Sequence, residues 1–281
     1  MKRRKFLKIL SGFGIAGLAT GMYAWQIEPF WLEFVKLPMA IKKLPASLTG
    51  KTVMQISDLH IGNRFSRQYL IDSLKEAHNY HPDFVVYTGD FVSYETAEQF
   101  EQLRHVIQYA PKGTKGTVAI LGNHDYGKNW AETDVADCIA EILRTNGIQV
   151  LRNEKVHIDG LTFTGLDDFW GTNYNPGDIL KTINPEEANI VLCHNPDVAD
   201  EPVWHHYDSW ILSGHTHGGQ CKPPFLPAPM LPVKNKRYSA GKIDLSGGRT
   251  LYINRALGHL WQIRFNVRPE ITVFTLESNL G

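Results

Sequence analysis

The sequence predicts an α/β fold in which two packed sheets are flanked by helices. Short apolar runs rich in β-branched residues alternate with amphipathic stretches in the first half of the chain, a pattern typical of strand-helix-strand units. In the second half such runs follow one another with little helical pattern between them, which indicates a strand-rich second half. The 281 residues, 43% of them hydrophobic, are enough to bury one large core.

The individual elements follow from these patterns. The predicted strands cover residues 52–57, 84–88, 117–121, 161–164, 190–193, 210–213, 250–253 and 271–276. Predicted helices cover residues 66–80, 97–109 and 133–146, and in the first of them Leu70, Ile71, Leu74 and Ala77 share one face. Residues 223–232 contain five prolines and are expected to form a loop.

Charge and cysteine content exclude several classes of protein. The chain has 29 Lys and Arg against 29 Asp and Glu, but five of the basic residues precede the first acid, Glu28, so the remainder is mildly acidic. A mildly acidic body argues against nucleic acid as the main partner, because binding to phosphate backbones depends on clustered Lys and Arg. The three cysteines, Cys138, Cys193 and Cys221, have no CxxC spacing and predict neither a disulfide scaffold nor a cysteine zinc site.

The N-terminus is expected to be an export address. Residues 9–25 are 17 uncharged residues that include four glycines, a stretch shorter and less apolar than the roughly 20 residues of a confident spanning helix. With the basic residues before it, the segment is typical of a signal peptide. The run Arg3-Arg4-Lys5-Phe6-Leu7-Lys8 resembles the twin-arginine signal, which implies export of a folded, metal-loaded protein.

Cleavage of this segment is an open alternative. The small-x-small pattern is poor at Met22-Tyr23-Ala24, so residues 1–27 are interpreted as a twin-arginine-type signal peptide or a retained N-terminal membrane anchor. Either would place the protein at the cytoplasmic membrane or on its periplasmic, extracytoplasmic side. Residues 28–50 form an aromatic and basic linker suited to a membrane interface, or alternatively one that packs its aromatic rings on the catalytic domain. Residues 51–278 are the expected catalytic domain.

Polar side chains of the kind that bind metals follow five of the predicted strands. The carboxyl ends of strands converge on one crevice in α/β sheets, so residues distant in the sequence are expected to meet there. In two of the five segments the ligands are two positions apart, which lets both face the same way along an extended chain. The candidate residues are Asp58 and His60, Asp90, Asn123 with His124 and Asp125, His194, and His215 with His217.

The ordered set Asp-x-His, Gly-Asp, Gly-Asn-His-Asp, His and Gly-His-x-His resembles the calcineurin-like metallophosphoesterase superfamily over residues 51–277. Phrases such as Ile56–Gly62 and Gly214–Gln220 are similar to its YaeI/YkuE-like branch of bacterial membrane-associated phosphoesterases. The resemblance implies a four-layer α-β-β-α sandwich of two mixed sheets flanked by helices. One departure is that many relatives have a further Asp after Gly-Asp, whereas Asp90 is followed here by Phe91-Val92-Ser93-Tyr94. We expect this departure to affect the substrate side rather than metal binding.

The resemblance also implies a ligand set and a mechanism. One divalent ion would be held by Asp58, His60, Asp90 and His217, and a second by Asp90, Asn123, His194 and His215. Oxygen and imidazole ligands without thiolate suit Mn, Fe or Zn. Two ions bridged by Asp90 would share a hydroxide that attacks phosphorus, and His124 would act as the general acid. Asp125 is expected to orient His124 or raise its basicity, or alternatively to cap the following turn.

These residues predict a binuclear metal-dependent phosphodiesterase or pyrophosphatase at the membrane. Its substrate would be a phosphodiester or a pyrophosphate, and a lipid-linked substrate is one alternative. Three alternatives remain: a phosphomonoesterase, a UDP-2,3-diacylglucosamine pyrophosphatase of lipid A synthesis, and a non-catalytic scaffold with this fold. The export signal conflicts with a UDP-2,3-diacylglucosamine pyrophosphatase, because the substrate of that enzyme is made on the cytoplasmic side of the membrane. Residues 165–170 and 223–232 either shape the substrate entrance or serve packing. The remaining histidines are expected to be surface or core residues, namely His78, His81, His105, His157, His205, His206 and His259.

Overall fold

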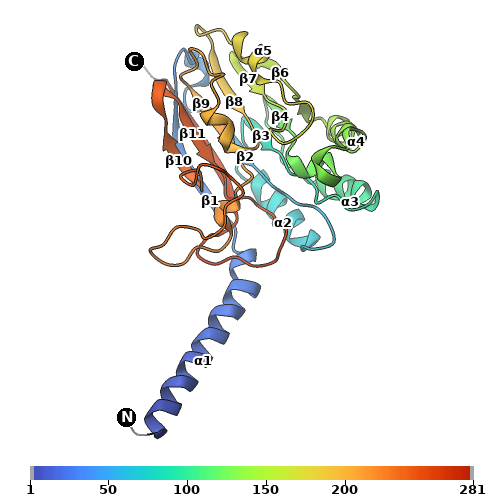
Figure 1. Ribbon diagram of the computed structural model, residues 1–281. Helices are drawn as coiled ribbons and strands as arrows, with labels where there is room; N and C mark the ends of the chain where they lie inside the picture. Colours follow the sequence, from blue (N-terminus) through green and yellow to red (C-terminus); the bar gives the residue numbers. More distant parts are fainter. Residues whose placement is uncertain (1–2, 279–281) are drawn as a thin grey trace.

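The computed structural model describes residues 3–278 and contains two six-stranded sheets (Figure 1). The first has the order β1-β12-β2-β3-β4-β5, and β2, β3, β4 and β5 run parallel to one another. Its strands are β1 (Glu33–Ile41), β2 (Thr52–Ile56), β3 (Phe84–Thr88), β4 (Gly116–Ile120), β5 (Gln149–Val150) and β12 (Glu270–Ser278).

The second sheet has the order β10-β11-β9-β8-β7-β6, with antiparallel strands at its two edges and parallel strands between them. Its strands are β6 (Glu154–Ile158), β7 (Leu161–Gly165), β8 (Ala188–Leu192), β9 (Trp210–Ser213), β10 (Gly241–Asp244) and β11 (Thr250–Ile253). Both sheets are therefore mixed, as predicted.

Three apolar clusters hold the layers together. Buried side chains such as Val86 and Ile120 of the first sheet meet Phe163 and Ile190 of the second, and this cluster forms the centre of the sandwich. The outer face of the first sheet is covered by α2 (Arg67–His78), α3 (Glu98–Ile107) and α4 (Thr133–Thr145). A third cluster lies beyond the second sheet, on the side of α5 (Pro176–Lys181) and the 3-10 turn at Pro196–Asp200. The predicted four-layer α-β-β-α sandwich is confirmed.

All eight predicted strands and all three predicted helices are present, but residues 28–50 are not simply a linker. Glu33–Ile41 forms β1, an edge strand that pairs with β12 in parallel from Glu33 opposite Glu270 to Ile41 opposite Ser278. From Val35 to Ile41 every second residue is the less exposed one, but the segment contains Pro38, which only an edge strand tolerates, and only Met39 and Ile41 are buried. The strand also packs on the domain through a side chain of its own, since Phe34 stacks on Tyr80 with ring centroids 4.3 Å apart.

A single helix, α1 (Arg3–Gln26), precedes this strand and projects from one end of the domain (Figure 1). Within residues 3–278, none of the helices combines the length and the apolar character that crossing a membrane requires. The C-terminal end of α1 is joined to a later loop: the Ala24 carbonyl accepts from the Arg264 amide at 2.9 Å and the Trp25 carbonyl from Gln262 Nε2 at 3.0 Å.

Candidate metal centre

The candidate ligands come from the carboxyl ends of β2, β3 and β4 in one sheet and of β8 and β9 in the other. Asp58 lies two residues beyond β2, and Asp90 lies two residues beyond β3. Asn123 begins the 3-10 turn at Asn123–Tyr126 after β4, and His194 and His215 each lie two residues beyond their strands. All seven predicted ligands are buried. The two sheets thus deliver oxygen and nitrogen ligands to one site at their common edge.

The backbone at most of these ligands is left-handed. The φ angles are 53° at Asp58, 46° at His60, 54° at Asp90, 71° at His215 and 51° at His217. Each such conformation costs a non-glycine residue about 1–3 kcal/mol and persists only where the surrounding structure enforces it. The alternation inferred from an extended chain is therefore not how Asp58 and His60 reach the same site; successive turns of the backbone bring them there.

Glycines next to the ligands allow the loops to approach closely. A Cβ on Gly122 would lie 2.3 Å from Asp90 Oδ1, and one on Gly214 would lie 2.3 Å from Asp58 Oδ2. Both distances are far below van der Waals contact, so only glycine lets the loop after β4 and the loop after β9 reach the two carboxylates.

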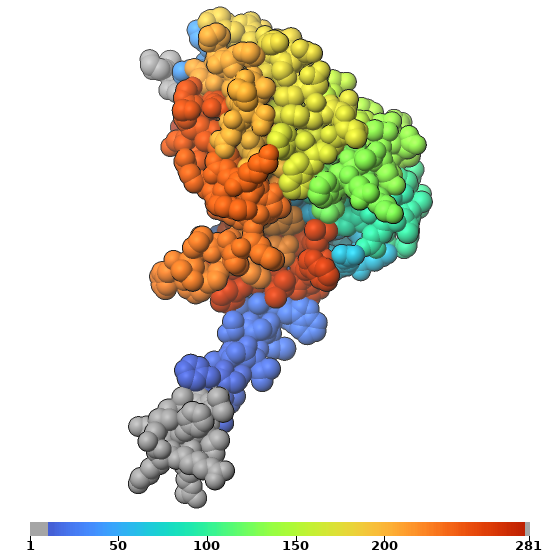
Figure 2. Space-filling model, in the orientation of Figure 1, coloured from blue at the N-terminus to red at the C-terminus, as the bar shows by residue number. Residues whose placement is uncertain are grey.

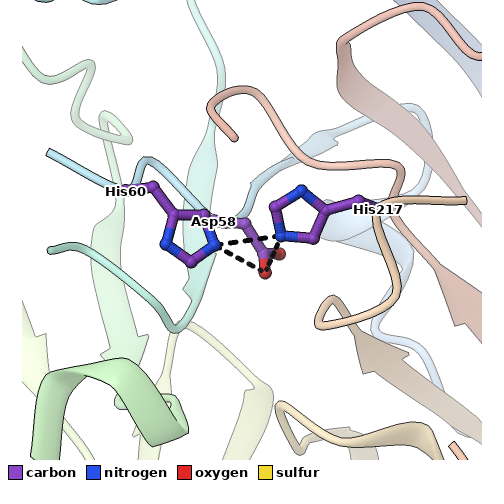
Figure 3. A group of neighbouring side chains, drawn as sticks. All are labelled: Asp58, His60 and His217. Carbon is purple, nitrogen blue, oxygen red and sulfur yellow. Dashed lines mark hydrogen bonds and ion pairs between the residues drawn. The ribbon is translucent and has the colours of Figure 1, made fainter. Parts of the chain in front are cut away.

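Asp58, His60 and His217 form one group of ligand atoms (Figure 3). His217 Nε2 lies 3.2 Å from Asp58 Oδ1 and 2.9 Å from His60 Nε2. The other oxygen, Asp58 Oδ2, accepts from the Ser57 hydroxyl at 2.5 Å, and both carboxylate oxygens lie within 3.2 Å of the His215 amide. The Asp58 carboxylate is therefore held in place from behind while Oδ1 faces the two imidazoles.

Asp90, His194 and His215 form a second group. Asp90 Oδ2 lies 3.1 Å from His194 Nε2 and 3.6 Å from His60 Nε2, so the same oxygen faces both groups. Asp90 Oδ1 accepts from the His124 amide at 2.9 Å. The side-chain oxygen of Asn123 is buried without a hydrogen-bond partner. An unpaired buried oxygen is costly unless a cation binds it, so Asn123 fits the role of a ligand.

The hydrogen bonds behind the imidazoles decide which nitrogen faces the site. His194 Nδ1 lies 2.8 Å from the Thr88 carbonyl, and His215 Nε2 lies 3.0 Å from the Pro232 carbonyl, so each of these nitrogens carries the proton. The remaining nitrogens, His194 Nε2 and His215 Nδ1, then point lone pairs at each other across 3.2 Å. In two neutral rings these lone pairs repel, and either a proton on His194 or a cation between the rings removes the repulsion. The donor set therefore fits two divalent ions.

Burial and neighbouring charges keep most of the ligands in the protonation states that bind metals, which are an ionised carboxylate and a neutral imidazole. Burial raises the pKa of Asp58, but the His217 imidazole outweighs it and lowers that pKa to about 2. Burial lowers the pKa of His60 well below its usual range and that of His215 to about 3. At His194 burial is outweighed by Asp90, which raises the pKa of the imidazole, so a cation there competes with a proton.

His124 and Asp125 occupy different environments. His124 is only partly buried, and its ring lies perpendicular to that of His60 with centroids 5.0 Å apart. The expected contact between Asp125 and the His124 ring is absent among the described residues. Instead the Asp125 carboxylate accepts from the amides of Phe91 at 2.9 Å, Val92 at 3.2 Å and Gly122 at 2.9 Å. Asp125 caps the turn and ties the loops after β3 and β4 together, because its side chain points at the backbone and not at the imidazole.

A cavity of about 840 Å³ opens over the ligands. His60, Asp90, Asn123 and His124 line its floor. Its walls are largely apolar and come from four loops, with the lining residues Trp130, Trp170, Pro229 to Pro232, and Leu260, Trp261 and Ile263. The predicted entrance segments 165–170 and 223–232 therefore both contribute to the cavity. Residues 258–263 were not expected there, because nothing in their composition marks them as site residues.

Two further polar residues, Ser93 and His259, have buried side chains and lie outside the predicted ligand set. The hydroxyl of Ser93, three residues after Asp90, lies 3.1 Å from His60 Nδ1. The ring of His259 is buried against Phe65 with centroids 3.7 Å apart, and burial lowers its pKa to about 2. His259 is thus a neutral core residue, while the other histidines outside the site are exposed or partly buried. The three cysteines are free thiols.

Two mixed sheets that present buried carboxylates, imidazoles and an amide at one edge define a metal-dependent phosphoesterase. Residues 51–219 match the calcineurin-like phosphoesterase family, and the chain belongs to that family. It is 31% identical to the uncharacterized metallophosphoesterase YkuE of Bacillus subtilis, over 99% of this chain and 98% of the relative. It is 30% identical to phosphodiesterase YaeI of Escherichia coli, over 98% and 99%. Identity to the UDP-2,3-diacylglucosamine pyrophosphatase LpxG of Chlamydia trachomatis is 29%, over 91% and 92%.

Proposed function

We propose that the protein is a binuclear metal-dependent phosphodiesterase or pyrophosphatase with His124 as general acid. The observation that carries the proposal is that Asp90 Oδ2 faces imidazoles of both ligand groups, His60 at 3.6 Å and His194 at 3.1 Å. A carboxylate in this position can bridge two cations. When bound, two such ions supply an activated water and neutralise charge on the phosphoryl group.

The general acid of the proposed reaction is His124. His124 lies at the floor of the cavity and is only partly buried, so its ring can reach an ester oxygen and hold a proton there. Its amide donates to Asp90 Oδ1, which fixes the position of His124 relative to the bridging carboxylate. A proton delivered from a fixed position lowers the barrier for departure of the leaving oxygen. The apolar walls exclude water around the ester.

The substrate class follows from the cavity and the relatives. A cavity of about 840 Å³ with several large apolar side chains accepts an ester with a bulky group on each side of phosphorus, which favours a diester or pyrophosphate over a monoester. The names of two relatives, a phosphodiesterase and a UDP-2,3-diacylglucosamine pyrophosphatase, point the same way. A lipid-linked pyrophosphate is therefore the second candidate substrate.

The test uses the full chain loaded with Mn²⁺ and two chromogenic esters, bis-p-nitrophenyl phosphate and p-nitrophenyl phosphate. The diester is expected to be the better substrate. His124→Ala should lower kcat by about 10²–10⁴-fold and leave the metal content unchanged, as expected for loss of a general acid. Asp90→Asn should lower both metal content and activity. If neither substitution changes the rate of hydrolysis, this site does not catalyse it, and the protein would be a non-catalytic scaffold. A preference for the monoester would indicate a phosphomonoesterase.

We infer further that the N-terminal segment directs the protein to the extracytoplasmic side of the cytoplasmic membrane through Arg3 and Arg4. Support comes from the order of basic residues and uncharged residues in 1–27. Cells expressing the chain with a C-terminal tag would be fractionated. The conservative variant Arg3→Lys with Arg4→Lys should retain the tag in the cytoplasm, because the twin-arginine signal requires both arginines, whereas Lys2→Arg should not change its distribution. Unchanged distribution of the paired variant would refute this route.

A further inference from the structure

Large exposed apolar side chains are confined to a few segments of the molecule. Among side chains in residues 11–278, those of Phe225, Met230 and Trp261 are 105%, 79% and 67% exposed. With one exception, Trp130, every large exposed apolar residue in this range lies in residues 13–31, 225–230 or 261–263. Scattered exposed apolar residues are normal, but a concentration of them marks an interaction surface.

These segments are neighbours in space. The side-chain amide of Gln220 donates to the carbonyls of Trp261 at 3.2 Å and Ile263 at 3.0 Å, which joins the start of the proline-rich loop to residues 261–263. Residues 262 and 264 in turn bond to the end of α1. Figure 2 shows the proline-rich loop projecting from the domain beside the base of α1. We call residues 222–237 and 258–263 together the apolar face.

The charged side chains within the apolar face itself are all basic, although Asp197 and Asp200 adjoin it at residues 234 and 235. Residues 209–243 contain five Lys and Arg and no Asp or Glu. Lys222, Lys234 and Arg237 are exposed, and none of the ion pairs found within residues 3–278 involves them. The rest of the body is acidic on balance, so the basic charges are concentrated where the apolar side chains are exposed. Exposed aromatic and aliphatic residues with unpaired basic residues are the combination that binds an anionic lipid surface.

The metal cavity opens through the same surface. Met230 and Trp261 line the cavity and are also among the most exposed apolar side chains. A bilayer in contact with these residues would cover the mouth of the cavity, and an ester in that bilayer could enter with its phosphorus directed at the ligands while its acyl chains stay among apolar residues.

We propose that the apolar face docks the catalytic domain on the surface of an anionic bilayer and that the cavity thereby receives phosphodiester or pyrophosphate lipids. Docking itself needs no catalysis, whereas the choice of substrate rests on the function proposed above. The two parts are therefore measured separately.

Docking is tested with a fluorophore whose emission rises in apolar surroundings. Phe225→Cys in the full chain, with Cys138→Ser and Cys221→Ser, places the only accessible thiol of the described residues at the loop tip, since Cys193 is buried. Vesicles of phosphatidylcholine and phosphatidylglycerol should raise the emission severalfold. The matched control keeps exposed Cys138 on α4 as the label site in a Cys221→Ser chain, and its emission should not change. Because the probe reports the loop itself, binding of α1 alone cannot produce the signal.

Substitution of the basic residues tests whether docking depends on the negative charge of the lipid. Lys222→Gln, Lys234→Gln and Arg237→Gln together should weaken binding to the anionic vesicles by about a hundredfold, because each of these residues attracts the negative surface. Binding to vesicles of phosphatidylcholine alone should change little. A loop signal that is absent with every vesicle, or that rises with protein concentration without vesicles, would overturn the proposal. A signal that rises with protein concentration alone would indicate that the apolar face binds another copy of the chain.

The substrate part compares a diacyl phosphatidyl-p-nitrophenol in vesicles with soluble bis-p-nitrophenyl phosphate. Phe225→Ser with Leu226→Ser removes apolar area outside the cavity, so hydrolysis of the lipid ester should fall about tenfold or more while the soluble ester is unaffected. Equal effects on both esters would contradict a docking role. If the soluble ester is hydrolysed and the lipid ester is not, the substrate assignment fails; if neither is hydrolysed, the proposed function fails, and the fluorophore still decides whether the face docks.

Discussion

The imidazole of His60 is held from behind by the Ser93 hydroxyl, whose oxygen lies 3.1 Å from Nδ1. Both side chains are buried, and the contact leaves His60 Nε2 directed at Asp58 and Asp90. Partners behind a metal-binding imidazole fix its tautomer and orientation, and their loss costs about 10–100-fold in metal affinity. Of the residues that follow Asp90, Ser93 therefore lies where it can support a metal ligand.

Ser93→Ala is predicted to weaken Mn²⁺ binding by about tenfold or more, because His60 loses its partner. Ser93→Asp should restore or exceed the original affinity, since a carboxylate raises the basicity of the imidazole. Titration calorimetry on metal-depleted protein measures both. Ser246→Ala removes an exposed hydroxyl far from the site and provides the comparison. Equal affinities for the alanine variants at positions 93 and 246 would show that Ser93 does not support the ligand.

Gly122→Ala is predicted to abolish metal binding and to displace the loop after β3. The added Cβ would lie 2.3 Å from Asp90 Oδ1 and 2.7 Å from the Asp90 amide, so both the carboxylate and the backbone of Asp90 must move. Gly177→Ala is the matched control, because nothing lies within 4 Å of its added Cβ. Metal content by elemental analysis and far-UV circular dichroism would be compared for the two variants. Retention of two ions by Gly122→Ala would contradict the close approach.

The order of strands and ligands could be read from the sequence because buried parallel strands such as β3 and β8 are continuous apolar runs that end abruptly in polar residues. Edge strands could not be predicted from the sequence in this way. β1 contains Pro38 and only two of its residues are buried, so its place beside β12 depends on a partner more than 200 residues away. The left-handed backbone at Asp58 and His217 could not be predicted either, because neither residue type demands that conformation and the enforcing contacts are long-range.

Asp125 is predicted to stabilise the fold and not to tune His124. Its carboxylate accepts from three backbone amides, so Asp125→Ala should lower the free energy of unfolding by about 1–3 kcal/mol, while Asp125→Asn keeps one acceptor oxygen and should cost less. Urea unfolding measures both. The pH profile of kcat should keep its midpoints in the asparagine variant. A displaced midpoint would mean that Asp125 acts on the imidazole after all.

Bound metal should contribute strongly to stability. Two buried carboxylates, Asp58 and Asp90, lie among the imidazoles of the site, and an ion that binds only the folded chain stabilises it by about 2.7 kcal/mol at a hundredfold excess over Kd. For a protein of this size that corresponds to a rise of about 5–10 °C in Tm. Thermal unfolding of chelator-treated protein with and without Mn²⁺ measures the rise. It should shrink as the pH falls through the neutral range, because Asp90 raises the pKa of His194 well above 6.5 and a proton then competes with the ion for this imidazole. A rise that is independent of pH would point to binding elsewhere.

Trp130 is predicted to select esters with bulky groups. Its ring stacks on that of Trp170 with centroids 4.7 Å apart, and Trp170 in turn meets His215 edge-on at 4.5 Å. Trp130 itself touches no ligand and is held in a left-handed conformation with φ of 57°, as is Asn129 with φ of 56°. Trp130→Ala should raise KM for bis-p-nitrophenyl phosphate about two- to tenfold, the value of one aromatic stacking contact, with kcat and metal content little changed. Trp130→Phe should recover most of the loss. If KM for the diester and for p-nitrophenyl phosphate rose equally, the ring would contribute to general packing of the cavity wall and not to recognition of the second ester group.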